Sequence, residues 1–337
     1  ATVDALAAGD KHTEQFTVSL SDGSTTTVTI TITGTDDLPV ISADSGAATE
    51  GDLTPVTGTL TASDADNPGL TFVAGNESRD YGRFEVGTDG KWSFVLADNA
   101  TVDALAAGDK HTEQFTVKLS DGSTTTVTIR VTGTNDAPVA TSAALTVVTP
   151  VPENATDAEN PGTLVSSLLL SATGTSLVVD VDTNDITPGI AVYGSSTTNG
   201  MAGTWQYKLN GSSTWTDFTP AASAATLIPH NALVRFVAAT NTDDAKEHGT
   251  ATLQYYAWDG RVHAQTETPD VSSGRGGNSA FSLNALSATI NVTARNDAPT
   301  LTLTQGTITL AERGPGNIVL TGNASPQTSF EDRKSVV

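Results

Sequence analysis

Acidic and amide side chains gather in short loops of this 337-residue chain, and they are the residues best placed to do chemistry. One loop, SDADNPG, carries Asp64, Asp66 and Asn67 within four positions. Carboxylate and carbonyl oxygens are the ligands that Ca²⁺ takes, about six to eight at a time. These residue types at this spacing therefore predict calcium sites in the loops.

The candidate calcium ligands lie in four settings: a lone glutamate, acidic loops, a hairpin turn, and connectors that end in proline. They are Asp36, Asp37, Glu50, Asp64, Asp66, Asn67, Asp121, Asn135, Asp136, Glu153, Asp180, Asp182, Asp259, Asn296 and Asp297. Asp and Asn also cap turns through their own side chains, so any single member could serve only its turn. Recurrence of the whole set beside the connectors favours calcium.

Charge and composition limit the partners. The chain has 38 acidic and 16 basic residues and a formal net charge of −22, which argues against nucleic acid or an anionic membrane surface and favours a cation. It has no cysteine, which excludes disulfides and thiolate metal sites. No apolar run approaches the roughly 20 residues needed to cross a bilayer.

Catalytic motifs are missing from the sequence. It contains no HExxH, no GxSxG and no glycine-rich phosphate loop. Carboxylates are so frequent that no pair stands out as an acid–base dyad. We therefore expect a protein that is not an enzyme.

An internal repeat sets the architecture. Residues 1–40 recur at 100–139, with 35 of 40 positions identical. The differences are Ser19/Lys118, Thr31/Arg130, Ile32/Val131, Asp36/Asn135 and Leu38/Ala137. The period of 99 residues is about the size of an immunoglobulin-like sandwich, so a tandem array is expected.

Local patterns within the repeat predict β-structure. Residues 124–134 read TTTVTIRVTGT, in which apolar residues alternate with threonine as in a strand with one buried face. Asp121-Gly122 marks a hairpin turn, and Val102–Ala107 is the one good helical stretch of the repeat. Residues 41–134 are thus expected to form about seven strands in two sheets. The fold class is all-β, with tandem immunoglobulin-like or cadherin-like β-sandwiches in an extended array.

Three segments carry a family resemblance: GTLTASDADNPG (58–69), YGRFEVGTDGKWSFVLADN (81–99) and VDALAAGDKHTEQFTVKLSDGSTTTVTIRVTGTNDAP (102–138). In order and spacing they resemble the VCBS repeat of giant bacterial surface adhesins, and the resemblance covers residues 1–139. It implies an extended secreted protein exported by type I secretion, with calcium-dependent folding, cell attachment and biofilm formation.

A larger module follows. Its expected strands are Leu164–Ser171, Ser176–Val181, Gly189–Tyr193, Thr204–Leu209, Thr214–Phe218, Ala232–Ala238, Thr250–Trp258 and Ser287–Ala294. Trp205 and Trp215 are expected to pair across an Asn210-Gly211 turn, and Val262–Asn278 to form a long polar loop. This hairpin resembles those of cadherin-like domains in the same adhesins. Part of the acidic set also resembles the cadherin calcium pattern: Glu153, the pair Asp64 and Asp66, and the pair Asn135 and Asp136.

The connectors divide the chain. The expected parts are the C-terminal part of a repeat (1–35), a complete repeat (36–136), the larger module (137–297) and the start of another (298–331). The last six residues, 332–337, match the in-frame translation of a common sequencing adapter. We expect them to be non-biological and the chain to be a fragment.

Together these observations predict a calcium-stabilised repeat region of a large secreted or cell-surface bacterial adhesin. Its partners would be calcium ions, neighbouring repeats and a cell-surface glycan or protein. The alternative is that residues 137–297 bind a glycan or peptide, with Trp205, Tyr207 and Trp215 as an aromatic platform, although paired aromatics usually pack across a sheet. An active domain outside this sequence is a third reading.

Overall fold

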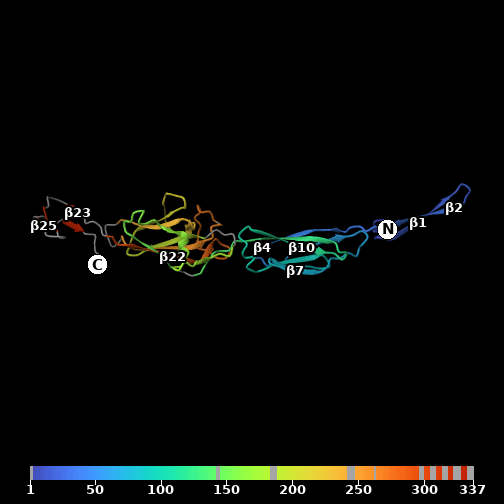
Figure 1. Cartoon of the computed structure of the whole chain (residues 1–337), viewed down its shortest axis with the longest axis horizontal. Coiled ribbons are helices and arrows are strands. Elements are labelled where there is room, and N and C mark those ends of the chain that lie inside the picture. The colour runs from blue at the N-terminus through green and yellow to red at the C-terminus, as the bar shows by residue number, and fades with distance from the viewer. Residues whose placement is uncertain are drawn as a thin grey trace. The chain divides into compact units, whose positions relative to one another are not determined.

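The computed structural model describes residues 3–141, 145–182, 188–240, 247–261 and 263–295, and the backbone of four short strands between 300 and 331. It divides into two compact units. The first comprises Ala1–Asp136 and Asp180–Asp185, and the second comprises Ala137–Val179 and Ile186–Val337. The predicted all-β fold of tandem β-sandwiches is confirmed (Figure 1).

The complete repeat in the first unit is a sandwich of two main sheets. One has the order β10-β11-β4 and the other β5-β9-β8-β7, and β3 pairs with β6. The strands are β3 (Val40–Ile41), β4 (Asp44–Thr49), β5 (Val56–Thr59), β6 (Ala62–Ser63), β7 (Gly75–Arg79), β8 (Gly82–Val86), β9 (Lys91–Leu96), β10 (Lys110–Lys118) and β11 (Thr124–Thr132). Seven of these are longer than two residues, as the alternation of apolar residues predicts.

Aromatic rings fill the space between these sheets. Phe115 of β10 stacks on Phe84 of β8 with ring centroids 4.6 Å apart, and Phe94 of β9 lies 5.8 Å from Phe115. Val127 and Ile129 of β11 are fully buried beside them. The apolar face of the hairpin β10–β11 is therefore covered by the opposite sheet.

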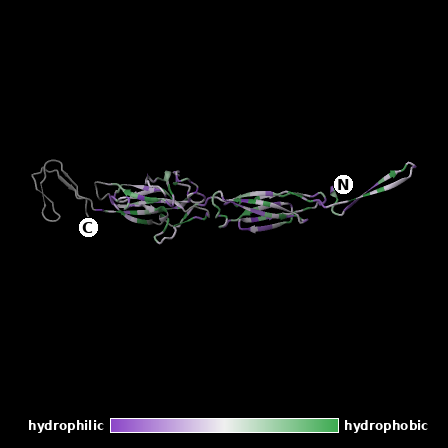
Figure 2. Cartoon of the chain, turned by 45° about the horizontal axis from the view of Figure 1, so that its top comes forward, coloured by the Kyte–Doolittle hydropathy of each residue, from purple (hydrophilic) through white to green (hydrophobic). Residues whose placement is uncertain are grey.

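The first 35 residues form a second copy of that hairpin without a covering sheet. A short 3₁₀ turn, η1 (Val3–Ala5), precedes β1 (Lys11–Ser19) and β2 (Thr25–Thr33), which pair only with each other. Every residue of β1 is exposed. Figure 2 shows hydrophobic residues alternating with hydrophilic ones along these strands.

The second unit also has two main sheets. Their orders are β13-β22-β21-β16-β19 and β14-β20-β17-β18, and β12 pairs with β15. The strands are β12 (Val139–Ala140), β13 (Leu145–Pro152), β14 (Thr163–Leu164), β15 (Val178–Val179), β16 (Gly189–Thr197), β17 (Gly203–Lys208), β18 (Thr216–Phe218), β19 (Thr226–Ile228), β20 (Leu233–Ala238), β21 (Gly249–Trp258) and β22 (Phe281–Thr293). Past residue 299, β23 (Thr300–Leu303) pairs with β26 (Thr328–Glu331), and β24 (Thr309–Glu312) with β25 (Ile318–Thr321).

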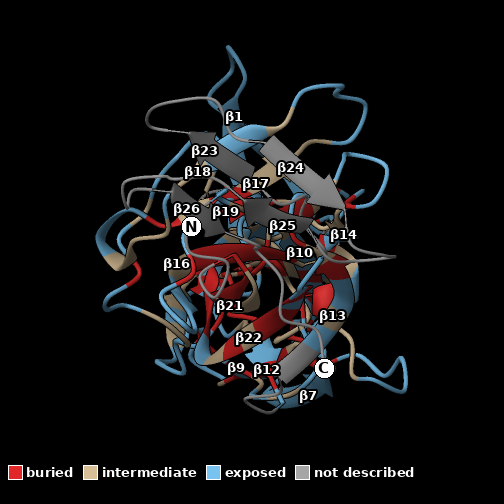
Figure 3. Cartoon of the chain, turned by 90° about the vertical axis from the view of Figure 1, so that its left-hand side faces the viewer, coloured by how far each residue is buried: buried red, intermediate tan, exposed pale blue. Residues whose placement is uncertain are grey.

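The C-terminal end of β21, in the five-stranded sheet, is buried on both faces. One face joins the main core, where Tyr255 is fully buried and donates from its hydroxyl to the Leu168 carbonyl at 2.8 Å. The other face packs Tyr256 and Trp258 against Val271 and Phe281 in a smaller cluster. Figure 3 shows this burial along β21 and β22. The described part of Val262–Asn278, the segment predicted as a long polar loop, contains no strand. Its Val271 packs against the sheet.

Two local expectations are wrong. Residues 164–171 were expected to form a strand, but they contain the short helix α1 (Val165–Leu168), with Val165 and Leu168 buried. Residues 102–107 form turns rather than a helix. The sequence patterns also miss β13 and β19, and a second short 3₁₀ turn, η2, occupies Ala222–Ala224. No helix in the described part of the chain is long and apolar enough to cross a membrane.

Candidate metal centre

Glu50 stands where two parallel strands of the first unit end. The pairing of β4 with β11 sets Thr49 beside Thr132. The Glu50 amide then donates to the Thr132 carbonyl at 2.9 Å, and the Thr134 amide donates to Glu50 Oε2 at 2.7 Å. These bonds hold a nearly buried carboxylate against the start of the connector.

The same place gathers further carboxylates. The Asp136 amide donates to Asp182 Oδ2 at 3.1 Å, and the Asp182 amide donates to Asp180 Oδ1 at 3.3 Å. Asp182 is 5% exposed. We call Glu50, Asp136 and Asp182 the Glu50 cluster.

Electrostatics within the Glu50 cluster are unfavourable to negative charge. Burial raises the pKa of Glu50, and Asp136 and Asp182 raise it further against the opposing Thr134 amide bond. The pKa of Asp136 is also raised, first by burial and then by Asp103. A cation placed here would relieve the repulsion that these shifts report.

Part of the arrangement occurs a second time. The Asp37 amide donates to Asp66 Oδ2 at 3.1 Å, and the Asp66 amide donates to Asp64 Oδ1 at 3.1 Å. This repeats the geometry of Asp136, Asp182 and Asp180. In both acidic pairs, Asp64/Asp66 and Asp180/Asp182, the second aspartate therefore accepts a hydrogen bond from the amide of a connector aspartate.

Glu153 repeats the position of Glu50 in the second unit. Its amide donates to the Thr293 carbonyl at 2.9 Å, and its Oε1 accepts from the Arg295 amide at 2.5 Å. Glu153 is 1% exposed, and its Oε2 lies 3.5 Å from His248 Nδ1. The connector residues Asn296 and Asp297, predicted to complete this set, lie outside the described residues.

Two predicted ligands accept hydrogen bonds from the backbone of their own turns. Asp121 Oδ1 accepts from the amide and hydroxyl of Ser123, and these bonds lower its pKa, so it caps its own turn. It precedes β11, about 26 Å along that strand from Glu50. Asp259 follows β21 at the end opposite Glu153, and its Oδ1 accepts from the Arg261 amide at 2.9 Å.

The remaining predicted ligands flank these contacts. Asn135 is nearly buried, and its amide group donates to the Asp136 carbonyl at 3.1 Å. The Asn67 amide donates to Asp64 Oδ1 at 3.2 Å, while Asp36 is exposed on the connector.

Two further acidic residues at these places carry no recognisable sequence motif. Asp103 affects the pKa of Asp136 but lies in the stretch expected to be helical, where no metal motif marks it. Glu247 is 1% exposed, and its Oε2 accepts a hydrogen bond from Asn154 Nδ2 at 3.2 Å. The two residues are 93 positions apart, and no sequence pattern links them.

The side chains have the right chemistry for a hard cation but do not converge on a point. Among the described residues, no group of three His, Asp or Glu side chains is arranged to hold a metal ion. Carboxylates that repel one another point apart when no cation draws them together. Binding would therefore require side-chain rotation within the Glu50 cluster.

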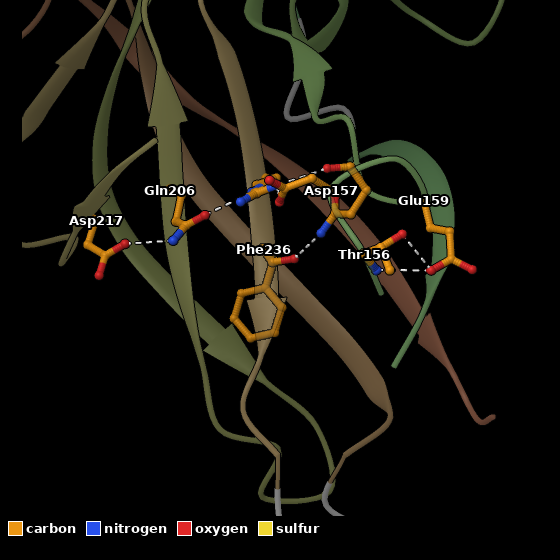
Figure 4. A network of polar contacts seen from close by, with 8 residues as sticks. Thr156, Asp157, Glu159, Gln206, Asp217 and Phe236 are labelled. Atoms are coloured by element: carbon orange, nitrogen blue, oxygen red, sulfur yellow. Dashed lines mark hydrogen bonds and ion pairs between the residues drawn. The ribbon is translucent and has the colours of Figure 1, made fainter. Parts of the chain in front are cut away.

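A separate polar network crosses the outer face of the four-stranded sheet (Figure 4). Arg235 donates from Nε to Gln206 Oε1 at 2.8 Å and from Nη1 to Asp157 Oδ1 at 2.7 Å. Asn160 Nδ2 donates to the Phe236 carbonyl at 2.8 Å, and Gln206 Nε2 donates to Asp217 Oδ1 at 2.7 Å. The charged and amide groups of this network hydrogen-bond to one another. Asp157 and Asn160 thereby hold the loop at 156–160 against β20.

The predicted aromatic platform is not formed. Trp205 is 6% exposed and packs edge-on against Phe236, 5.3 Å away between ring centroids. It pairs across the hairpin with Phe218 rather than with Trp215. The ring of Tyr207 packs against Phe218. The Arg235 guanidinium carbon lies 4.0 Å from the centroid of the Trp215 ring. The alternation of β17 sends Trp205 into the core, so the three rings do not share a surface.

One family model matches part of the chain. Residues 36–133 match the bacterial cadherin-like domain. This cadherin-like module contains Glu50 and the Asp64–Asp66 loop. The expected assignment of this segment to VCBS repeats stays a prediction.

Several similar solved structures are extracellular segments of cadherins. Mouse cadherin-23 EC22-24 has 17% identity and a TM-score of 0.41, and the match covers 89% of this chain and 80% of that one. The human desmocollin-1 ectodomain has 14% identity and a TM-score of 0.39, and the match covers 86% of this chain and 49% of that one. Protocadherin gamma B2 extracellular cadherin domains 3-6 has 15% identity, a TM-score of 0.40 and 81% coverage of this chain. The chain spans 55% of that structure's length. No curated protein matches the chain.

Proposed function

We propose that the Glu50 cluster binds Ca²⁺ and that the ion stabilises a repeat of an extracellular, adhesion-type protein. The observation that carries this proposal is the gathering of Glu50, Asp136 and Asp182, where the glutamate's pKa is raised by burial and by both aspartates. Oxygen-rich sets of this kind suit Ca²⁺ rather than zinc or copper.

Each residue has a defined part in this proposal. Glu50 would bind through its carboxylate while Oε2 keeps the Thr134 amide. Asp136 brings a carboxylate from the connector, and Asp182 brings one from the acidic loop. The bound cation would supply the positive charge that lets all three stay ionised.

Recurrence supports a role in a repeat array. Glu153 repeats the backbone contacts of Glu50, and Asp37 with Asp66 repeats those of Asp136 with Asp182. The family match adds a cadherin-like module. We infer that the chain is a segment of a large secreted or cell-surface bacterial adhesin whose repeats extend a rod for cell attachment and biofilm formation.

Location would control the state of such a protein. Extracellular calcium would fill the sites, whereas the low calcium of the cytosol would leave the carboxylates to repel and keep the chain unfolded for export. At a 100-fold excess over its dissociation constant, each ion would add about 2.7 kcal/mol to the free energy of unfolding. That is a large share of a typical total of about 5–15 kcal/mol.

A thermal melt of the full chain with calcium and with excess chelator tests the proposal. We expect calcium to raise the midpoint of the first unit by about 10 °C, from one ion and the usual entropy of unfolding of a small domain. Glu50→Gln and Asp136→Asn should each remove most of this rise. Asp121→Asn is the matched control, because Asp121 serves its own turn, and it should keep the rise.

Identical melts with calcium and chelator would refute the calcium site. A rise that survives both cluster substitutions would place the calcium elsewhere and remove the Glu50 cluster from the account.

A further inference from the structure

A cavity of about 600 Å³ lies at one end of the five-stranded sheet of the second unit. Gly189, which begins β16, pairs with Trp258 at the end of β21. The next residue of β16, Ile190, pairs with Ile228 at the end of β19. The cavity is lined by these strand ends, by the turn after β19 and by the loop after β21, all within the second unit. Its volume falls in the range of small-molecule sites, about 300–1,000 Å³.

The indole of Trp258 lines this cavity and has an unpaired donor. Trp258 is 4% exposed, and its Nε1 has no hydrogen-bond partner among the described residues. The equally buried Trp92 of the first unit instead donates from Nε1 to Asp44 Oδ2 at 2.9 Å. An unpaired buried donor is costly. A ligand that brings an acceptor into the cavity would therefore be stabilised by the Trp258 N–H.

Three more polar side chains in the lining are available to a ligand. They are His230 and Asn231 from the turn after β19, and Gln265 from the loop after β21. None of the three side chains forms a hydrogen bond within the part of the chain that the structure describes. Amides and imidazoles both donate and accept hydrogen bonds, so together they suit hydroxyl groups.

The opposite wall is held in place by its own contacts. His263 Nδ1 lies 2.7 Å from Glu267 Oε2, and the imidazole stacks on Phe281 with ring centroids 5.3 Å apart. The Ala264 amide donates to Glu267 Oε1 at 3.1 Å. The His263 contact, and then the Ala264 amide, lower the pKa of Glu267. This wall is therefore preorganised, which lowers the cost of binding.

Charge argues for a neutral ligand. The charged residues that line the cavity are Glu267, paired with His263, and Arg261, which already has an interaction within the chain. The net charge of −22 opposes an anionic ligand. A metal is not indicated, since no group of three His, Asp or Glu side chains among the described residues is arranged to hold one. An apolar ligand would leave the polar lining unpaired.

We propose that this cavity binds the terminal unit of a neutral saccharide. The Trp258 N–H donates to a sugar oxygen, and His230, Asn231 and Gln265 bond to hydroxyl groups. Pro229 and the indole ring provide apolar surface for the C–H groups of the sugar. The site would give the second unit a direct part in attachment, and it does not rest on the calcium proposed at the Glu50 cluster.

The test follows the indole N–H signals of the four tryptophans by NMR in the full 337-residue chain with calcium present. Glucose, galactose, mannose, fucose, N-acetylglucosamine and N-acetylgalactosamine are titrated separately, and Trp258→Phe assigns the Trp258 signal. We expect at least one sugar to shift this signal saturably, with a Kd of about 1 mM or below, and to leave the Trp92 signal unchanged.

Lining variants connect the shift to the cavity. Asn231→Ala and Gln265→Ala should each weaken binding about fivefold, the loss of one hydrogen bond. The matched controls are Asn210→Ala and Gln254→Ala, which change exposed side chains outside the lining and should bind like the unchanged chain.

Failure of all six sugars to shift the Trp258 signal would overturn the proposal. So would equal binding by the two lining variants and the unchanged chain, or binding of glucuronic acid without binding of any neutral sugar.

Discussion

Glu50 and Glu153 show how a backbone position can define a candidate ligand. Both follow the first strand of a parallel pair, donate an amide to the last residue of the second strand, and accept from an amide two residues further on. Their surroundings differ, because Glu153 lies near His248 whereas Glu50 faces other carboxylates. The same position in the fold therefore carries different electrostatics in the two units.

Glu159 offers a residue-scale prediction that depends on pH. The Arg295 guanidinium, with the amide and hydroxyl of Thr156, lowers its pKa from 4.5 to about 2. A lowered pKa means that the contact stabilises the fold above pH 4.5 and that this contribution is lost as the pH falls through about 2. An NMR titration of the Glu159 carboxyl should show a midpoint near 2.

Two variants separate the causes of this shift. Arg295→Gln removes the largest one and should raise the midpoint most, and Thr156→Val should raise it less. A wild-type midpoint near 4.5 would show that the Glu159–Arg295 contact is not maintained in solution.

At the scale of elements, the hairpin β17–β18 separates a core ring from a surface ring. Trp205→Ala should cost about 3–5 kcal/mol, because the indole is buried against Phe236. Trp215→Ala should cost less, since this half-buried ring mainly loses its contacts with Arg235 and Lys208, worth about 0.5–2 kcal/mol each.

Urea unfolding followed by hydrogen exchange in β17 and β20 would measure both costs in the full chain. Tyr207→Phe is a suitable control, because it keeps the ring that packs on Phe218. Equal costs for the two tryptophan substitutions would contradict the assignment of one ring to the core and one to the surface.

Elements with a regular alternation of apolar and polar residues could be predicted from the sequence, and short apolar runs without that alternation could not. The strand β11 alternates valine and isoleucine with threonine, so its bounds follow from its pattern. Residues 164–171 read LVSSLLLS, an apolar run that suits a strand or a buried helix equally, and α1 forms there. The contact of Val271 with β21 leaves no periodic signal at all.

Candidate ligands could be predicted by type but not sorted by role. Asp121 and Asp136 look alike in sequence, yet the first caps a turn and the second joins the Glu50 cluster. Their difference arises from strand pairing across residues 44–132, which local spacing does not encode. Asp103 was missed for the same reason.

At the scale of the whole molecule, the net charge of −22 must oppose compact structure when calcium is absent. Much of that repulsion acts between exposed carboxylates, which salt screens over about 10 Å at 0.1 M. The raised pKa values of Glu50 and Asp136 show that repulsion and burial also act at one nearly buried place. Salt screening should therefore weaken the repulsion between exposed carboxylates more than the repulsion within the Glu50 cluster.

Thermal melts at low and high sodium chloride test this balance. In chelator, raising the salt from about 10 mM to about 1 M shortens the screening length from about 30 Å to about 3 Å and should raise the melting temperature. In calcium the salt effect should be smaller, because the proposed cation would already neutralise the Glu50 cluster. Glu50→Gln should lower the difference between the two series without abolishing the salt effect, since most of the 38 acidic residues remain. A melting temperature that falls with salt in chelator would show that attractive ion pairs, such as Arg79 with Glu113, outweigh the repulsion.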